Sequence, residues 1–94
     1  MKTTNVPGLS ICEDVLSEEM ETEIIKWLDT REWSTVLPRR TQHYGYTYNY
    51  GGGNVSHADK FEGWITHLSD FLAENNIMKN ANQCIVNEYS FFAF

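Results

Sequence analysis

The sequence is poor in cysteine and in basic residues, and both shortages exclude classes of protein. Its two cysteines, Cys12 and Cys84, lie too far apart for the paired spacing of a structural zinc site or a small disulfide scaffold. They fit free thiols in a reducing compartment. Seven Lys and Arg stand against thirteen Asp and Glu, which gives a net charge of -6. A protein that binds nucleic acid mainly by neutralising phosphates carries the opposite balance.

Long apolar runs are also missing. The opening stretch MKTTNVPGLS lacks the continuous apolar core of a secretory signal, and no later run is long enough to cross a bilayer. We therefore expect an intracellular protein, in the cytoplasm or the nucleus, without membrane contact. A nucleophile elbow and a CxxC pair are absent, and Gly51-Gly52-Gly53 has no P-loop lysine after it.

Two amphipathic helices and several short strands account for most of the chain. Ser17 is typical of a helix N-cap, with acidic residues in the next turn and an apolar stripe that predicts a helix to about Thr30. A capping box of Ser56 and Asp59 predicts a second helix, which ends near Asn75. The stripe of the first helix consists of Met20, Ile24, Trp27 and Leu28. The segments predicted to be extended are 9–16, 32–37, 40–50 and 83–89. This order of elements predicts an α+β fold with two amphipathic helices packed on a small sheet.

The segment YGYTYNY, residues 44–50, has tyrosine at every second position. If it forms one strand, all four rings project from the same face, because strand side chains alternate between faces. Two interpretations remain open. The rings form a hydrophobic sheet face, which aromatic residues favour, or they form a platform for a flat ligand such as a nucleobase.

Two polar pairs also allow more than one interpretation. Arg39-Arg40 either holds a phosphate or carboxylate, which the arginine fork matches, or is an ordinary solvated pair. Asn87 and Tyr89 share a face of the last predicted strand, where an amide and a phenol together either hydrogen-bond a small acid or end the strand as polar residues.

The trio His57-Ala58-Asp59 contains half of a two-histidine, one-carboxylate iron site. The remaining ligand would be His67, which lies two turns further along the same predicted helix and is too distant. We interpret His57 and Asp59 as part of a helix cap and predict no metal site.

Taken in order, PRRTQHYGYTYNY, a helix containing WITHLSDFL, and NQCIVNEY resemble the N-terminal portion of AlkB-like iron(II)/2-oxoglutarate-dependent dioxygenases. The upstream VPGLSICEDVLSEEMETEIIKWLD is similar to the opening strand and first helix of the family, so the resemblance runs from about Pro7 to Tyr89. It implies the N-terminal part of a double-stranded β-helix (jelly-roll) dioxygenase, as a single truncated domain over residues 1–94. The substrate-recognition segment would be about 39–50, and the catalytic barrel would start at about 83–89.

The resemblance also implies roles for particular residues. Asn87 and Tyr89 match the family's Asn-x-Tyr strand, which contacts 2-oxoglutarate. The implied substrate-binding residues are Arg39, Arg40, Tyr44, Gly45, Tyr46 and Tyr48, with Tyr46 and Tyr48 bordering the site for a flipped, alkylated base in DNA or RNA. The implied reaction is oxidative dealkylation with Fe(II) and 2-oxoglutarate, on DNA, RNA, tRNA or protein.

The chain departs from the family after its Asn-x-Tyr strand. The family continues with a His-x-Asp motif, a later His and arginines, whereas here only Ser90 and FFAF follow. His43, His57 and His67 all come before that strand. We therefore predict that this chain alone holds neither iron nor 2-oxoglutarate, has no catalytic residue and shows no dioxygenase activity. Either it is the front part of a truncated or split enzyme, which would self-associate through uncovered edges, or it is a small non-catalytic binding module derived from the family.

Overall fold

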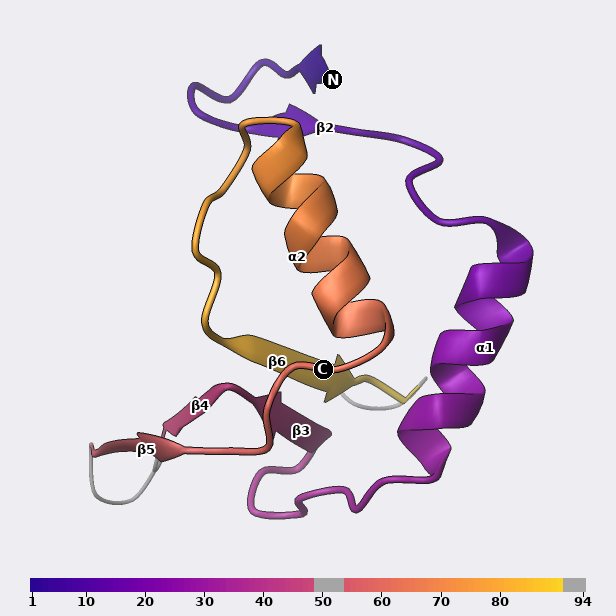
Figure 1. Ribbon diagram of the computed structural model, residues 1–94, viewed down its shortest axis with the longest axis vertical. Coiled ribbons are helices and arrows are strands. Elements are labelled where there is room, and N and C mark those ends of the chain that lie inside the picture. Colours follow the sequence, from indigo (N-terminus) through magenta and orange to yellow (C-terminus); the bar gives the residue numbers. More distant parts are fainter. Residues whose placement is uncertain (49–53, 91–94) are drawn as a thin grey trace. The chain divides into compact units, whose positions relative to one another are not determined.

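A computed structural model describes residues 1–48 and 54–90, in two compact units that comprise residues 1–31 and 32–94. In the first unit, β1 (Lys2–Thr3) pairs antiparallel with β2 (Ser10–Ile11), and helix α1 (Glu18–Asp29) follows (Figure 1). The predicted strand after Pro7-Gly8 is thus a two-residue strand, and its partner β1 was not predicted.

Helix α1 begins and ends where the sequence predicts. Ser17 Oγ accepts a hydrogen bond from the Met20 amide at 3.1 Å, and Thr30 is the C-cap residue. Acidic residues occupy the first turn, where they interact favourably with the helix dipole. Only the four stripe residues of α1 are half-buried or buried, and its other side chains are exposed. Local signals therefore suffice to define this helix.

The described residues of the second unit form two antiparallel strand pairs and one helix (Figure 1). β3 (Arg40–Tyr44) pairs with β6 (Cys84–Glu88), and β4 (Tyr46–Tyr48) pairs with β5 (Val55–His57). After α2 (Trp64–Glu74) the chain runs back beside that helix to reach β6. Two helices with small antiparallel sheets confirm the α+β class.

The single strand predicted for the tyrosine segment is two strands, because the extended conformation is interrupted at Gly45. This residue has φ +80°, and a Cβ atom there would lie 2.1 Å from the carbonyl oxygen of Asn82. Only glycine accepts both the left-handed backbone and this close approach. Tyr44, before the break, is buried in β3, whereas Tyr46, after it, is half-buried in β4. The prediction that four rings share one continuous strand is therefore wrong for these two. The Tyr48 side chain and Tyr50 lie outside the described residues.

The predicted start of the second helix is also wrong. Ser56 lies in β5 opposite Thr47, and Asp59 forms an isolated bridge with Tyr44. The helix begins only at Trp64, after Gly63, whose φ is +53°. A capping-box pattern depends only on neighbouring residues. Here the backbone of residues 55–57 pairs with β4 and therefore does not begin a helix.

The end of α2 is at the predicted place. Asn75 is the C-cap, and its side-chain amide donates to the Phe71 carbonyl at 2.9 Å. Helix α1 has 12 residues and α2 has 11, so no helix in the described part of the chain is long and apolar enough to cross a bilayer.

Candidate functional site

Pairing of β3 with β6 brings Arg39 to Asn87, which lies 48 positions later in the sequence. Arg40 lies opposite Glu88, and Thr41 lies opposite Asn87. Because opposite residues of an antiparallel pair project to the same face, Arg40 lies on the face of Glu88, whereas Arg39 reaches Asn87 on the other face. We call Arg39, Asn87 and Tyr89 the ladder-end cluster.

Within the ladder-end cluster, Arg39 contacts both other members. Its Nε donates to Asn87 Oδ1 at 2.9 Å, and its Cζ atom lies 6.0 Å from the centre of the Tyr89 ring, at the outer limit of a cation–π contact. Arg39 is half-buried, Asn87 is exposed, and Tyr89 is 65% exposed. No carboxylate among the described residues pairs with the Arg39 guanidinium. The cluster thus presents hydrogen-bond donors and a positive charge to solvent, which suits an anion.

Arg40 is engaged differently, although it is the next residue. Its Nε and Nη2 donate to the two Glu88 carboxylate oxygens, each at 2.7 Å, and its Cζ lies 4.6 Å from the centre of the Trp33 ring. The hydrogen bonds and the charge of Arg40 hold the pKa of Glu88 below its usual value. This geometry ties Arg40 to the strand pair. The sequence did not distinguish the two arginines, because their difference depends on the ladder register.

Two further rings meet on the hairpin of β4 and β5. Tyr46 lies opposite His57, with ring centroids 4.9 Å apart and ring planes at 33°. Tyr46 is half-buried and His57 is exposed. Sequence reasoning treated His57 as part of a helix cap and missed this pairing. The signal that could have found it is the glycine run between two short extended stretches, which is typical of a hairpin.

Tyr44 is separate from this pair. It is only 3% exposed, and its hydroxyl donates to the Gln42 side-chain oxygen. Gly45, also predicted to bind substrate, is positioned by its backbone: its amide donates to the Asp59 carbonyl at 2.6 Å. Both residues therefore have a clear packing role, and their predicted contact with substrate stays a prediction.

The described residues contain no group of three or more His, Cys, Asp and Glu side chains that could hold a metal ion. His43 lies on β3, His57 on β5 and His67 on α2.

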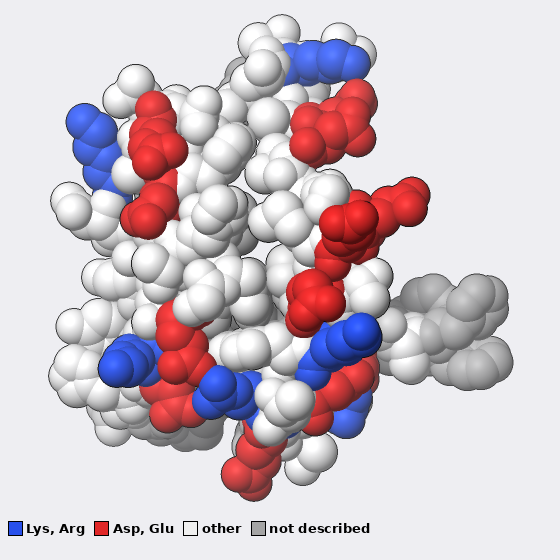
Figure 2. Space-filling model, turned by 45° about the vertical axis from the view of Figure 1, so that its right-hand side comes forward, with Lys and Arg blue, Asp and Glu red and all other residues white. Residues whose placement is uncertain are grey.

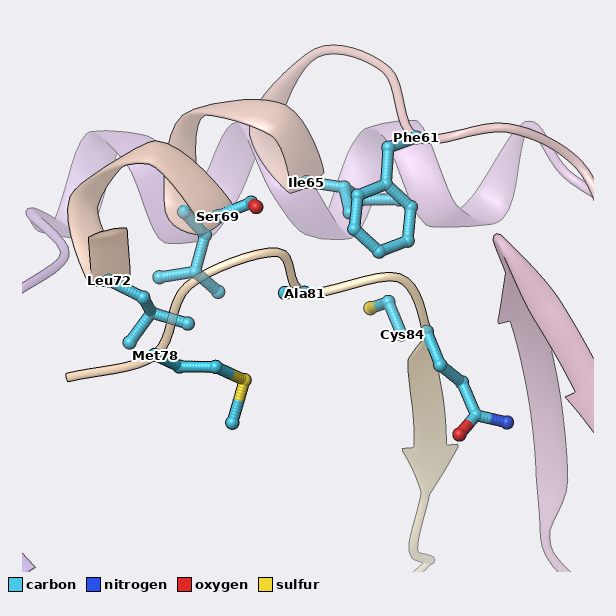
Figure 3. A pocket seen from close by; sticks show the side chains of 9 residues that line it. Phe61, Ile65, Ser69, Leu72, Met78, Ala81 and Cys84 are labelled. Atoms are coloured by element: carbon cyan, nitrogen blue, oxygen red, sulfur yellow. The ribbon is translucent and has the colours of Figure 1, made fainter. Parts of the chain in front are cut away.

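An apolar hollow of about 120 Å³ lies between α2 and residues 78–84 (Figure 3). Ile65, Leu68 and Leu72 line it from the helix, and Met78 and Cys84 from the returning chain. Burial raises the pKa of the Cys84 thiol, so the thiol stays protonated and is a weak nucleophile. None of the predicted site residues lines this hollow, and its apolar walls offer little to an acid or a phosphate.

The surface charge agrees with the composition. On the face shown in Figure 2, acidic side chains lie beside the Lys and Arg side chains of the described residues. Contact with nucleic acid on this face would therefore rest on something other than broad phosphate neutralisation.

Curated proteins with similar sequences cover most of this chain. The "Alkylated DNA repair protein ALKBH8 homolog" of Arabidopsis thaliana is 30% identical over 94 residues, or 90% of the chain. Two proteins named "tRNA (carboxymethyluridine(34)-5-O)-methyltransferase ALKBH8" each match 88% of it. The one from Macaca fascicularis is 26% identical and the one from Xenopus tropicalis is 30% identical.

The matches cover only a small part of each relative. The chain spans 27% of the Arabidopsis protein, 14% of the Macaca protein and 15% of the Xenopus protein. No family model and no solved structure matches the chain.

Proposed function

We propose, from the confirmed resemblance of this chain to the AlkB-like family, that it supplies the N-terminal portion of an iron(II)/2-oxoglutarate dioxygenase. Residues 39–50 would form the substrate-recognition segment, and residues 83–89 would form the first strand of a jelly-roll barrel. The observation that carries the proposal is the β3–β6 ladder. It joins the two stretches on which the resemblance rests, the Arg-Arg…Tyr-Gly-Tyr segment and the Asn-x-Tyr strand.

The substrate we propose is an alkylated or otherwise modified base in nucleic acid. One relative is named for repair of alkylated DNA and two are named for modification of tRNA. The paired rings of Tyr46 and His57 offer a surface on which an extruded base could stack. With a net charge of -6, this chain would recognise the base by stacking more than by phosphate contact.

The two cofactors of the family fit this chain to different degrees. The described residues do not fit iron, because the three histidines lie on separate elements and no ligand group forms. They do fit one end of 2-oxoglutarate, a dicarboxylate, because Arg39, Asn87 and Tyr89 can all donate hydrogen bonds at one place. In the complete enzyme, iron and 2-oxoglutarate would supply the oxidative chemistry. This chain would orient the acid and present the base.

It follows that the 94-residue chain would be inactive alone and would self-associate. A chimeric protein, called the graft below, tests whether this chain supplies the N-terminal portion of a dioxygenase. Residues 7–89 would replace the matching stretch of the Arabidopsis relative, and succinate release from 2-oxoglutarate would be measured with Fe(II). We expect the graft to retain turnover and the same graft carrying Asn87→Ala to lose most of it. A folded graft without turnover would contradict the proposal.

One observation supports the alternative function, a small non-catalytic binding module: the Tyr46–His57 ring pair, whose histidine is exposed, could bind a base without chemistry. Sedimentation and denaturant unfolding separate the two proposals. A monomer that unfolds cooperatively and binds an alkylated oligonucleotide supports the module. A self-associating chain without cooperative unfolding supports the enzyme fragment.

A further inference from the structure

The hydrogen bond from Arg39 to Asn87 determines which end of the Asn87 amide faces outward. A guanidinium N–H can only donate, so its partner at 2.9 Å has to be the amide oxygen and not the nitrogen. The Nδ2 group is then left on the other side of the amide. No described residue accepts a hydrogen bond from it, and the residue is exposed. Asn87 therefore keeps its N–H donors available to an incoming ligand, while its oxygen is engaged by Arg39.

The surroundings of this amide are also those of an anion site. The Nη groups of Arg39 have no carboxylate partner among the described residues, and the guanidinium lies within 6.0 Å of the Tyr89 ring centre. The Tyr89 hydroxyl adds a third group that can donate, on a side chain that is 65% exposed. Donor groups and one positive charge thus lie at the same exposed end of the ladder, and this combination matches a carboxylate.

We propose that Arg39 is a positioning residue that fixes Asn87 as a hydrogen-bond donor to a carboxylate of 2-oxoglutarate. The identity of the acid rests on the proposed function, whereas the orientation of the amide rests on the ladder geometry alone. Arg40, which Glu88 and Trp33 hold, has no part in this arrangement.

The physical reason is preorganisation. A free asparagine amide rotates about χ2 and presents its oxygen or its nitrogen, and the oxygen repels a carboxylate. Holding the amide in the donor orientation before the ligand arrives removes that ordering cost from binding. Arg39 achieves this from the half-buried side of the cluster, and its charge adds attraction for the same ligand.

The first test measures the order of the Asn87 side chain in the Arabidopsis graft, which supplies the rest of the enzyme, by ¹⁵N relaxation of its Nδ2 group. We expect an order parameter near the rigid value of about 0.85 in the natural sequence and below about 0.6 in Arg39→Ala. Arg39→Lys should restore part of the order, because the ammonium can donate to the same oxygen. Arg40→Gln, which loosens the neighbouring ion pair, should leave the Asn87 value unchanged. An Asn87 amide that is mobile in the natural sequence, or equally ordered in Arg39→Ala, would overturn the proposal.

The second test adds 2-oxoglutarate at millimolar concentrations to the same graft without iron, and follows the Asn87 Nδ2 and Tyr89 ring resonances. Without the metal, binding will be weak, so the signal is a fast-exchange shift. We expect the apparent affinity to fall at least severalfold in Arg39→Ala. Asn87→Asp keeps a hydrogen-bond acceptor for Arg39 but removes the amide N–H donors. We expect this variant to abolish the shift of the Tyr89 resonances when 2-oxoglutarate is added. No response in the natural sequence, or an equal one in Arg39→Ala, would overturn the carboxylate role. Failure of the proposed function looks different: the Arabidopsis graft would be inactive although Arg39 still orders Asn87.

Discussion

Tyr46 and His57 face each other across the β4–β5 hairpin, with ring centroids 4.9 Å apart and ring planes at 33°. The pair joins the recognition segment predicted from the sequence to a histidine that was not assigned to it. Because His57 is exposed and Tyr46 is half-buried, the histidine is the ring that a ligand would reach first.

We predict that His57→Ala weakens binding of an oligonucleotide that carries an alkylated base by about tenfold, because one stacking surface is lost. Tyr46→Ala should have a similar or larger effect. His67→Ala is the matched control, since His67 is exposed on α2 and lies outside the hairpin. Fluorescence anisotropy of a labelled oligonucleotide measures the affinities. Equal affinity of the His57 and His67 variants would contradict a role for this ring pair.

Gly45→Ala should reduce the free energy of unfolding by about 3 kcal/mol or more, because the new Cβ would overlap the Asn82 backbone and the residue keeps φ +80°. Gly8→Ala is a matched control: its φ is +82°, but no atom lies within 4 Å of the added Cβ. It should cost only about 1 kcal/mol, from the left-handed backbone. Urea unfolding of the Arabidopsis graft that carries each substitution, followed by tryptophan fluorescence, gives both values. Similar losses in the two variants would show that the close approach to Asn82 is unimportant.

Ser17→Ala should destabilise α1 by about 1 kcal/mol, because it removes the oxygen that accepts from the Met20 amide. Amide hydrogen exchange at Met20 should become faster, and helical circular dichroism should decrease. Ser56→Ala should change stability by less than about 0.5 kcal/mol, because Ser56 is exposed in β5 and caps no helix. A larger loss of stability in Ser56→Ala than in Ser17→Ala would contradict this and would favour the helix start at Ser56 that the sequence predicts.

The Arg40–Glu88 pair predicts a pH dependence of the β3–β6 ladder. Hydrogen bonds from Arg40, together with its charge, lower the pKa of Glu88 from 4.5. A lowered folded-state pKa means that the stabilisation is complete above the ordinary value and is lost as pH falls through the lowered one. NMR titration of the Glu88 carboxyl should show a higher pKa in Arg40→Gln and no change in Arg39→Gln. A pKa that does not respond to Arg40→Gln would contradict the pairing. The contribution should be small and should shrink in high salt, because both side chains are more than a third exposed.

The sequence predicted those features that depend on neighbouring residues. Helix α1 is correct at both ends because its cap, acidic first turn and apolar stripe all act within the helix. The predicted start of α2 was wrong because Ser56 pairs with Thr47 across the hairpin, and a local capping pattern does not reveal this pairing. The tyrosine strand breaks because Gly45 packs against Asn82, a residue distant in sequence.

The candidate site shows the same division. The sequence indicated Arg39, Asn87 and Tyr89 as separate groups, from residue type and from the resemblance. It gave no sign that Arg39 contacts the other two, because that contact exists only in one register of β3 against β6. Side chains alternate between faces along a strand, so a shift of one residue would place Arg40 beside Asn87 instead.

We propose that this chain supplies the N-terminal portion of an AlkB-like dioxygenase. Sequencing the gene and its transcript beyond the codon for Phe94, in every frame, tests this proposal. We expect a His-x-Asp motif soon after the Asn-x-Tyr strand, with a later His and arginines that would complete the iron and 2-oxoglutarate sites. A stop codon followed by unrelated sequence in every frame would contradict it.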